Sequence, residues 1–133
     1  MKKIESIMLI DDNKIDLFIN RKIIEKYNSD LPVNIFPNAN LALNHLKRFE
    51  INNSDPSIKK PDVIFLDINM PEMDGFQFLD EFDKLTFIEK KPIEIYMLSS
   101  SASHNDIEKA KNNTKCKDYI VKPLTLKKLN TII

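Results

Sequence analysis

The sequence predicts an α/β domain built on a doubly wound parallel sheet. Short apolar runs alternate along the chain with segments whose apolar residues recur at helical spacing, and this is the pattern of repeated βα units. Five such units fit into the 133 residues, and right-handed crossovers are expected to join their strands. In a sheet of this kind, a ligand site is expected at the carboxyl ends of the strands.

Length and composition indicate one domain, residues 1–133, and we expect no output domain. The 20 basic and 20 acidic residues cancel, so no overall field would hold the chain to nucleic acid or to an anionic membrane. The single cysteine, Cys116, cannot form an intrachain disulfide. The sequence also lacks a signal peptide and a membrane-spanning run, so we expect a cytoplasmic protein.

The first half of the chain predicts two βα units. The strands are Ile4–Ile10 and Val33–Phe36, and the helices are Lys14–Tyr27 and Asn38–Glu50. Asp12 or Asn13 is the expected N-cap of the first helix. The apolar residues of that helix at helical spacing are Ile15, Phe18, Ile19, Ile23 and Ile24. Residues 51–60 are polar and aperiodic, which predicts an exposed loop.

The second half predicts three further units. The strands are Asp62–Leu66, Ile93–Leu98 and Tyr119–Val121, and the helices are Phe76–Leu85, Ser103–Asn112 and Thr125–Ile133. Gly75, the only glycine, comes just before the third of the five predicted helices. Asn112 or Asn113 is expected to end the fourth helix in the left-handed conformation, in place of a glycine.

Residues capable of chemistry stand where the predicted strands end. Asp11 and Asp12 end the first strand, Asp67 the third, Ser99 the fourth and Lys122 the fifth. Three carboxylates at one edge would repel one another unless a cation neutralised them, and Mg²⁺ prefers such oxygen ligands. A hydroxyl and an ammonium nearby could donate to an anionic group, leaving one carboxylate as a nucleophile. This set predicts phosphoryl transfer to a carboxylate.

Each of these residues also has an ordinary structural explanation. Asp11 and Asp12 could cap the first helix. Asp67 and Ser99 could be turn residues, and Lys122 could be a solvated lysine. Their coincidence at one edge favours the chemical interpretation, because few positions lie at strand ends.

Four segments of the chain resemble bacterial response-regulator receiver domains, and the local pattern is closest to chemotaxis-type receivers. The segments are Ile7–Asp12, Leu66–Gly75, Met97–Ser100 and Tyr119–Pro123. They occur in the order and spacing of that family, and the resemblance covers essentially the whole chain. It implies a flavodoxin-like (βα)5 three-layer sandwich with the parallel sheet order 2-1-3-4-5.

The resemblance implies a role for each matched carboxylate. Asp67 would be the phosphoacceptor. Asp12 and Asp67 would ligate Mg²⁺ through their carboxylates, Asn69 through its backbone carbonyl, and Asp11 mainly through a bound water.

The resemblance also implies a switch at the remaining strand ends. Lys122 would pair with the phosphoryl oxygens, Ser99 would hydrogen-bond to them, and Pro123 would follow a cis peptide bond. Tyr119 would turn inward when Ser99 moves toward the phosphoryl group. The surface that changes would be the fourth helix, fifth strand and fifth helix, from about residue 103 to 133.

The implied partners are a sensor histidine kinase or a histidine phosphotransfer protein, and a downstream protein that binds the surface from 103 to 133. A homodimer would use the same face, whereas direct binding to nucleic acid or membrane is not expected. Such a domain is not a metabolic enzyme, since it catalyses only its own phosphorylation and dephosphorylation. Two alternatives stay open: a Mg²⁺-dependent phosphohydrolase with Asp67 as its nucleophile, and a phosphorylation-independent interaction module.

Overall fold

The computed structural model describes residues 4–51, 59–85, 93–100 and 103–133. Strands and helices alternate throughout: β1 (Ile7–Ile10), α1 (Lys14–Tyr27), β2 (Val33–Phe36), α2 (Ala39–Ile51), β3 (Val63–Leu66), α3 (Gly75–Asp83), β4 (Glu94–Ser99), α4 (His104–Lys111), β5 (Asp118–Val121) and α5 (Leu126–Ile132). The five strands form one parallel sheet in the order β2-β1-β3-β4-β5. The predicted fold class and strand order are confirmed.

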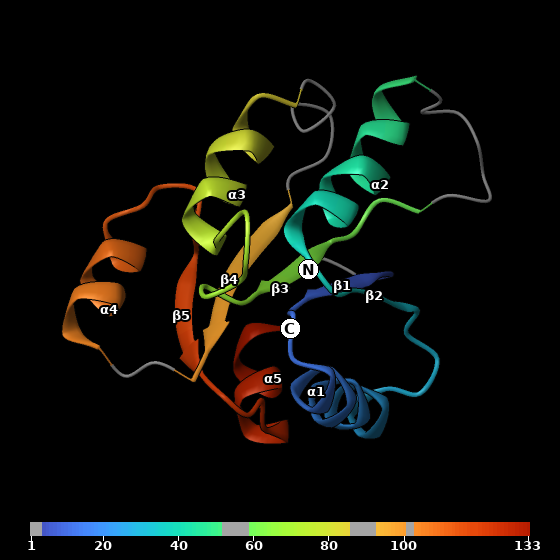
Figure 1. Ribbon diagram of the computed structural model, residues 1–133. Helices are drawn as coiled ribbons and strands as arrows, with labels where there is room; N and C mark the ends of the chain where they lie inside the picture. The colour runs from blue at the N-terminus through green and yellow to red at the C-terminus, as the bar shows by residue number, and fades with distance from the viewer. Residues whose placement is uncertain (1–3, 52–58, 86–92, 101–102) are drawn as a thin grey trace.

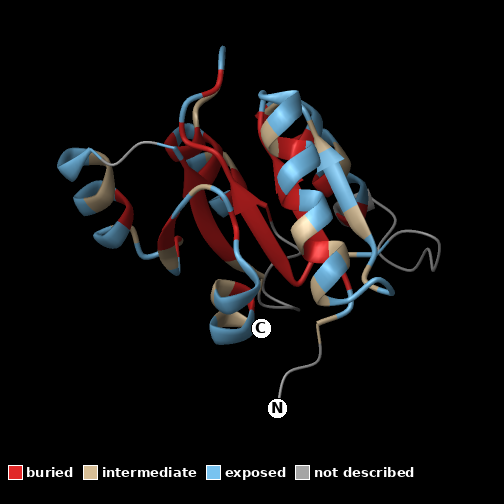
Figure 2. Ribbon diagram, turned by 90° about the horizontal axis from the view of Figure 1, so that it is seen from below, coloured by how far each residue is buried: buried red, intermediate tan, exposed pale blue. Residues whose placement is uncertain are grey.

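The sheet is the middle of three layers. Helices α2, α3 and α4 cover one face, and α1 and α5 cover the other (Figure 1). In β3, Ile64 and Leu66 pack toward the first group, whereas Val63 and Phe65 pack toward the second. Because both faces are covered, β1 and β3 are buried at every residue (Figure 2). This explains why their sequences are continuous apolar runs.

The first strand is shorter than predicted, since it begins at Ile7 and not at Ile4. The backbone N–H groups of Glu5 and Ser6 donate to one carboxylate oxygen of Asp62, at 2.6 and 3.2 Å. A side chain therefore takes the place of a neighbouring strand as the acceptor for these two amides. The Asp62 side chain is buried at the start of β3, and the pairing of β1 with β3 begins just beyond it.

Helix α1 forms over the predicted residues, but its buried face differs from the predicted apolar set. Asn13 is the N-cap, and its side chain accepts from the backbone N–H groups of Ile15 and Asp16. The buried residues are Leu17, Asn20 and Ile24. Ile15 and Phe18 are 69% and 62% exposed, and Ile19 is also exposed. The helix carries apolar residues on more than one side, so spacing alone could not identify the side that faces the sheet.

The chain leaves α4 without the predicted left-handed residue. Asn112 has a φ of −83°, and Glu72 is the one residue with positive φ in the part of the chain that the structure describes. Instead, the Asn113 side chain accepts from the N–H of Lys115, and its carbonyl accepts from the N–H of Cys116. This asparagine turn reverses the chain without a left-handed backbone.

The remaining boundaries agree with the predictions to within about two residues. Helix α2 continues through Ile51. The predicted loop at 51–60 otherwise falls mainly on residues 52–58, which lie outside the described ranges. Among the helices that the structure describes, none has the length and apolar character needed to cross a bilayer.

We predict that Asp62→Ala lowers the free energy of unfolding by roughly 2–4 kcal/mol, because it leaves two amide donors near the start of β1 without their acceptor. Urea denaturation of both proteins measures the change. Asp30→Ala is the matched control, since Asp30 is exposed, and it is expected to change stability by less than about 0.5 kcal/mol. Equal losses in the two variants would contradict the role of Asp62.

Candidate functional site

The strand register brings the predicted site residues to one edge of the sheet. Ile10 pairs with Leu66, and Leu66 pairs with Met97, so Asp11 and Asp67 follow directly on neighbouring strands. Ser99 is the last residue of β4 and pairs with Val121 of β5, after which Lys122 follows. All of them lie at the carboxyl ends of the strands, where the fold class predicts a site.

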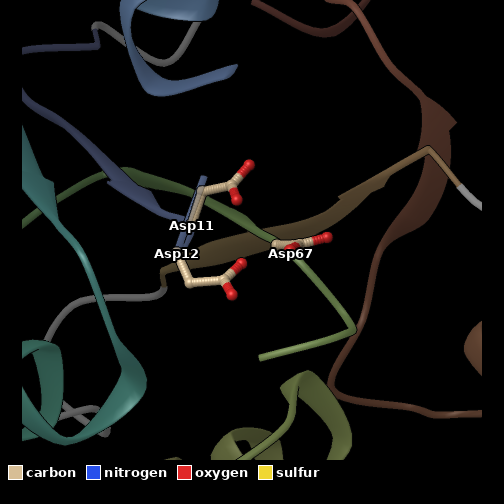
Figure 3. A group of neighbouring side chains, drawn as sticks. All are labelled: Asp11, Asp12 and Asp67. Carbon is tan, nitrogen blue, oxygen red and sulfur yellow. The ribbon is translucent and has the colours of Figure 1, made fainter. Parts of the chain in front are cut away.

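Three carboxylates gather at the centre of this edge. Asp11, Asp12 and Asp67 each offer a ligand oxygen, and these oxygens lie within 4.8 Å of one another. In Figure 3, Asp11 and Asp12 come from the end of β1 and flank the space beside Asp67. Asp11 and Asp67 are buried, whereas Asp12 is exposed. Such an all-oxygen set fits a hard divalent cation.

Lys122 supplies positive charge to this cluster. Its Nζ lies 2.6 Å from Asp11 Oδ2 and 3.5 Å from Asp67 Oδ1. The side chain is only 7% exposed, so these attractions are weakly screened by water. The peptide bond between Lys122 and Pro123 is cis, as the family resemblance implied.

The electrostatic environment raises the pKa of both Asp67 and Lys122, which disfavours the charged form of Asp67 and favours that of Lys122. Burial and the neighbouring Asp11 raise the pKa of Asp67 from 3.8 to about 7, although the positive charge of Lys122 opposes this shift. Burial by itself would lower the pKa of Lys122, but hydrogen bonds to Asp11 and Asp16 and the charge of Asp67 raise it. The ammonium therefore stays charged, while Asp67 is costly to ionise without further positive charge.

The backbone around Asp67 is held from two sides. Its N–H donates to the carbonyl of Ile10 at 2.9 Å, and its Oδ1 accepts from the N–H of Ile68 at 2.9 Å. The N–H of Gly75 donates to the carbonyl of Ile68 at 2.8 Å. A Cβ at position 75 would lie 2.6 Å from the carbonyl oxygen of Asp67. Glycine is therefore required where α3 begins.

The turn between β3 and α3 includes a strained residue. The N–H of Met73 donates to the carbonyl of Pro71 at 2.8 Å, which closes a three-residue turn around Glu72 at a φ of 69°. Asp74 then caps α3 through a reciprocal hydrogen-bond pair with Gln77. These two features direct the chain from the site into α3.

The other predicted site residues are placed as follows. Ser99 is fully buried at the end of β4. Asn69 is exposed, two residues after Asp67. Tyr119 is buried in the core between the sheet and the α2–α3–α4 layer.

Sequence reasoning missed two residues of α1 that reach this edge. Lys122 Nζ donates to Asp16 Oδ2 at 2.9 Å, and the N–H of Leu124 donates to Asn20 Oδ1 at 3.0 Å. An acidic residue in the first turn of a helix is ordinary because it interacts favourably with the helix dipole. Asp16 therefore gave no separate signal, and nothing in the sequence distinguished Asn20 from an exposed polar residue.

Comparison with known proteins identifies the family. The sequence-family model of the response regulator receiver domain matches residues 7–133 of the chain. A two-component response regulator from Cytophaga hutchinsonii has a similar structure, with a TM-score of 0.84, 32% identity, and coverage of 98% of this chain and 94% of that one. The phosphorylated cyanobacterial phytochrome response regulator RcpA has a TM-score of 0.73 at 26% identity, covering 98% of this chain and 89% of that one.

One relative in sequence is the two-component response regulator ORR26 of Oryza sativa subsp. japonica. It is 26% identical over 95% of this chain. The chain spans only 19% of that regulator's length, so the match concerns a small part of it.

We predict that Asp67→Asn stabilises the protein in a pH-dependent way when divalent cations are removed with EDTA. The Asp67 pKa rises from 3.8 to about 7 on folding, so the native state binds more protons between these values. Wild-type stability therefore falls as pH rises through this window. One pKa unit corresponds to about 1.4 kcal/mol, so the variant should be more stable by roughly 4 kcal/mol at about pH 8, and the difference should vanish below about pH 4. Urea denaturation across this range checks the prediction, and an offset independent of pH would contradict it.

Proposed function

The chain belongs to the response regulator receiver family, and from that premise we propose that Asp67 is its phosphoacceptor. Receiver domains act in two-component signalling. The observation that carries the proposal is the position of Asp67, which is buried at the sheet edge beside Asp11, Asp12 and Lys122. Asp11 also lies against this ammonium, so the choice of Asp67 between the two rests on the family motif around it.

The proposed reaction is a direct displacement at phosphorus. A carboxylate oxygen of Asp67 forms a bond to phosphorus while the bond from phosphorus to the leaving group breaks, and the leaving group departs with the electron pair. With acetyl phosphate the leaving group is acetate. With a phosphohistidine donor it is the imidazole, which takes up a proton.

A Mg²⁺ ion would fit the acidic cluster. Asp11, Asp12 and Asp67 supply oxygens close enough together to share one ion, and the backbone carbonyl of Asn69 would complete the protein ligands. When bound, the ion would neutralise charge on the carboxylates and on the transferring group. The raised pKa of Asp67 supports this proposal, since burial and the charge of Asp11 outweigh the opposing charge of Lys122.

Lys122 and Ser99 would hold the attached group. The Lys122 ammonium already lies within 3.5 Å of Asp67 Oδ1, so a phosphoryl oxygen on Asp67 would come within its reach. Ser99 stands at the end of the neighbouring strand β4, and its hydroxyl would donate to another phosphoryl oxygen. Charge-assisted hydrogen bonds of this kind are the stronger class.

The signal would pass through Ser99 and Tyr119. When Ser99 moves toward the phosphoryl group, Tyr119 would be favoured in its inward position, which shifts a pre-existing equilibrium. The surface formed by α4, β5 and α5 would then bind a downstream protein or a second copy of the chain. Val121 and Leu126 are exposed apolar residues on this surface, which supports its use in protein contacts.

The phosphoryl donor would be a sensor histidine kinase or a histidine phosphotransfer protein. Helix α1 begins next to the acidic cluster and exposes Ile15, Phe18 and Ile19. An apolar surface beside a reactive group supports the docking of a protein donor there.

Two alternatives are less well supported. A phosphohydrolase that turns over through Asp67 often has a second carboxylate two residues later, where this chain has Asn69. An amide cannot serve as the acid or base, so a phosphoryl group on Asp67 should persist long enough to signal. A module that works without phosphorylation would have no use for buried carboxylates that repel one another and cost stability.

We predict that incubation with acetyl phosphate and Mg²⁺ adds one phosphoryl group to the wild-type chain. Intact-protein mass spectrometry measures the adduct, which should be absent with EDTA and in Asp67→Asn. Asp30→Asn, at an exposed position, is the matched control and should be modified like the wild type. A wild type without adduct, in a sample where the donor remains intact, would favour the interaction module.

We predict that the Ser99→Ala variant still accepts the phosphoryl group on Asp67. Its Tyr119 ring, however, should no longer respond to phosphorylation. Fluorine NMR of 3-fluorotyrosine-labelled protein reports the ring, with the signal assigned through Tyr119→Phe. Acetyl phosphate and Mg²⁺ should change the Tyr119 signal in the wild type and not in Ser99→Ala. An identical response in both proteins would rule out Ser99 as the link.

A further inference from the structure

The Lys122 ammonium is held by three carboxylates from three different elements. Its Nζ lies 2.6 Å from Asp11 Oδ2, 2.9 Å from Asp16 Oδ2 and 3.5 Å from Asp67 Oδ1. A lysine ammonium has three N–H donors and no acceptor. Asp11 and Asp16 accept hydrogen bonds from two of these donors at short distance. The third N–H can therefore point toward Asp67.

Asp16 takes part in this arrangement but not in the acidic cluster. The carboxylates close enough to share a metal ion are Asp11, Asp12 and Asp67. The Asp16 side chain is 30% exposed, compared with 7% or less for Asp11 and Asp67. Its hydrogen bond to Lys122 joins residues 106 positions apart in the sequence. An acidic residue that only complemented the helix dipole would not need this contact.

Helix α1 holds the segment around Lys122 at a second point. Asn20, one turn after Asp16 and therefore on the same side of the helix, accepts from the backbone N–H of Leu124 at 3.0 Å. Asn20 is buried. Asn20 thus positions the backbone that follows Pro123, while Asp16 positions the side-chain ammonium that precedes it.

We propose that Asp16 is a positioning residue for phosphoryl transfer to Asp67, and that it acts by holding the Lys122 ammonium with one N–H free for the reacting group. This inference rests on the proposed function of Asp67. Lysine has a long, flexible side chain, and fixing it costs conformational entropy in each reaction cycle unless the resting structure already holds it. Asp11 alone leaves the ammonium free to rotate about one hydrogen bond, whereas Asp11 and Asp16 together define its orientation.

Asp16→Ala and Asp16→Asn test the proposal. We expect Asp16→Ala to be phosphorylated by acetyl phosphate about tenfold more slowly at saturating Mg²⁺, which is the usual effect of losing one charged hydrogen bond. Asp16→Asn keeps an acceptor oxygen in the same place and should lie between Ala and the wild type. Because Asp16 is partly exposed, neither change should unfold the domain, and thermal denaturation verifies this. The rate is followed by intact-protein mass spectrometry.

Two controls separate positioning from other effects. Glu25→Gln removes one negative charge from the exposed side of the same helix, where Glu25 pairs with Arg21 and Lys22, and should react like the wild type. In a Lys122→Ala background, Asp16→Ala should cause no further slowing, because the residue through which it acts is gone. Slowing of the same size in that background would overturn the proposal.

The Mg²⁺ titration of the rate gives a readout that a purely structural role would not produce. We expect Asp16→Ala to lower the rate at saturation while the half-saturating Mg²⁺ concentration stays within about twofold. A loss that disappears at high Mg²⁺, or a rate equal to or faster than that of the wild type, would overturn the role of Asp16 and leave Asp67 as phosphoacceptor. A wild type that takes up no phosphoryl group would instead overturn both proposals.

Discussion

The main physical constraint at the carboxyl edge of the sheet is the mutual repulsion of the Asp11, Asp12 and Asp67 carboxylates. Parallel pairing brings these residues to adjoining strand ends, and burial prevents water from screening two of them. Burial and the charge of Asp11 together keep the pKa of Asp67 raised, although Lys122 opposes them. The site is therefore poised to gain stability from any group that adds positive charge.

The rest of the domain holds this unfavourable arrangement in place. The strands beneath the site are buried on both faces, in two separate apolar clusters, and proteins generally offset local strain at a functional site through such packing. The far end of the sheet contributes as well, because Asp62 there binds the amides that precede β1. A buried carboxylate thus serves structure at one end of the sheet, whereas the carboxylates at the other end form the acidic cluster of the proposed site.

The sequence predicted the fold and the strand-end residues well, because both follow from local patterns. An apolar run that stops at a polar residue shows where a strand ends, and parallel pairing does the rest. The buried side of α1 could not be predicted, since Ile15 and Phe18 look as suitable for the core as Leu17. The contact between Asp16 and Lys122 was also hidden, because it depends on how α1 packs against the segment that follows β5, and the two residues are 106 positions apart.

The only glycine of the chain and its only described left-handed residue stand three positions apart, and they are not the same residue. Glu72 adopts the backbone that glycine would adopt without strain, at a cost of roughly 1 kcal/mol, while Gly75 is used for its missing side chain. The two positions therefore differ in their freedom to change over evolutionary time. Glycine would relieve the strain at position 72, whereas any side chain at position 75 would displace the backbone that carries Asp67.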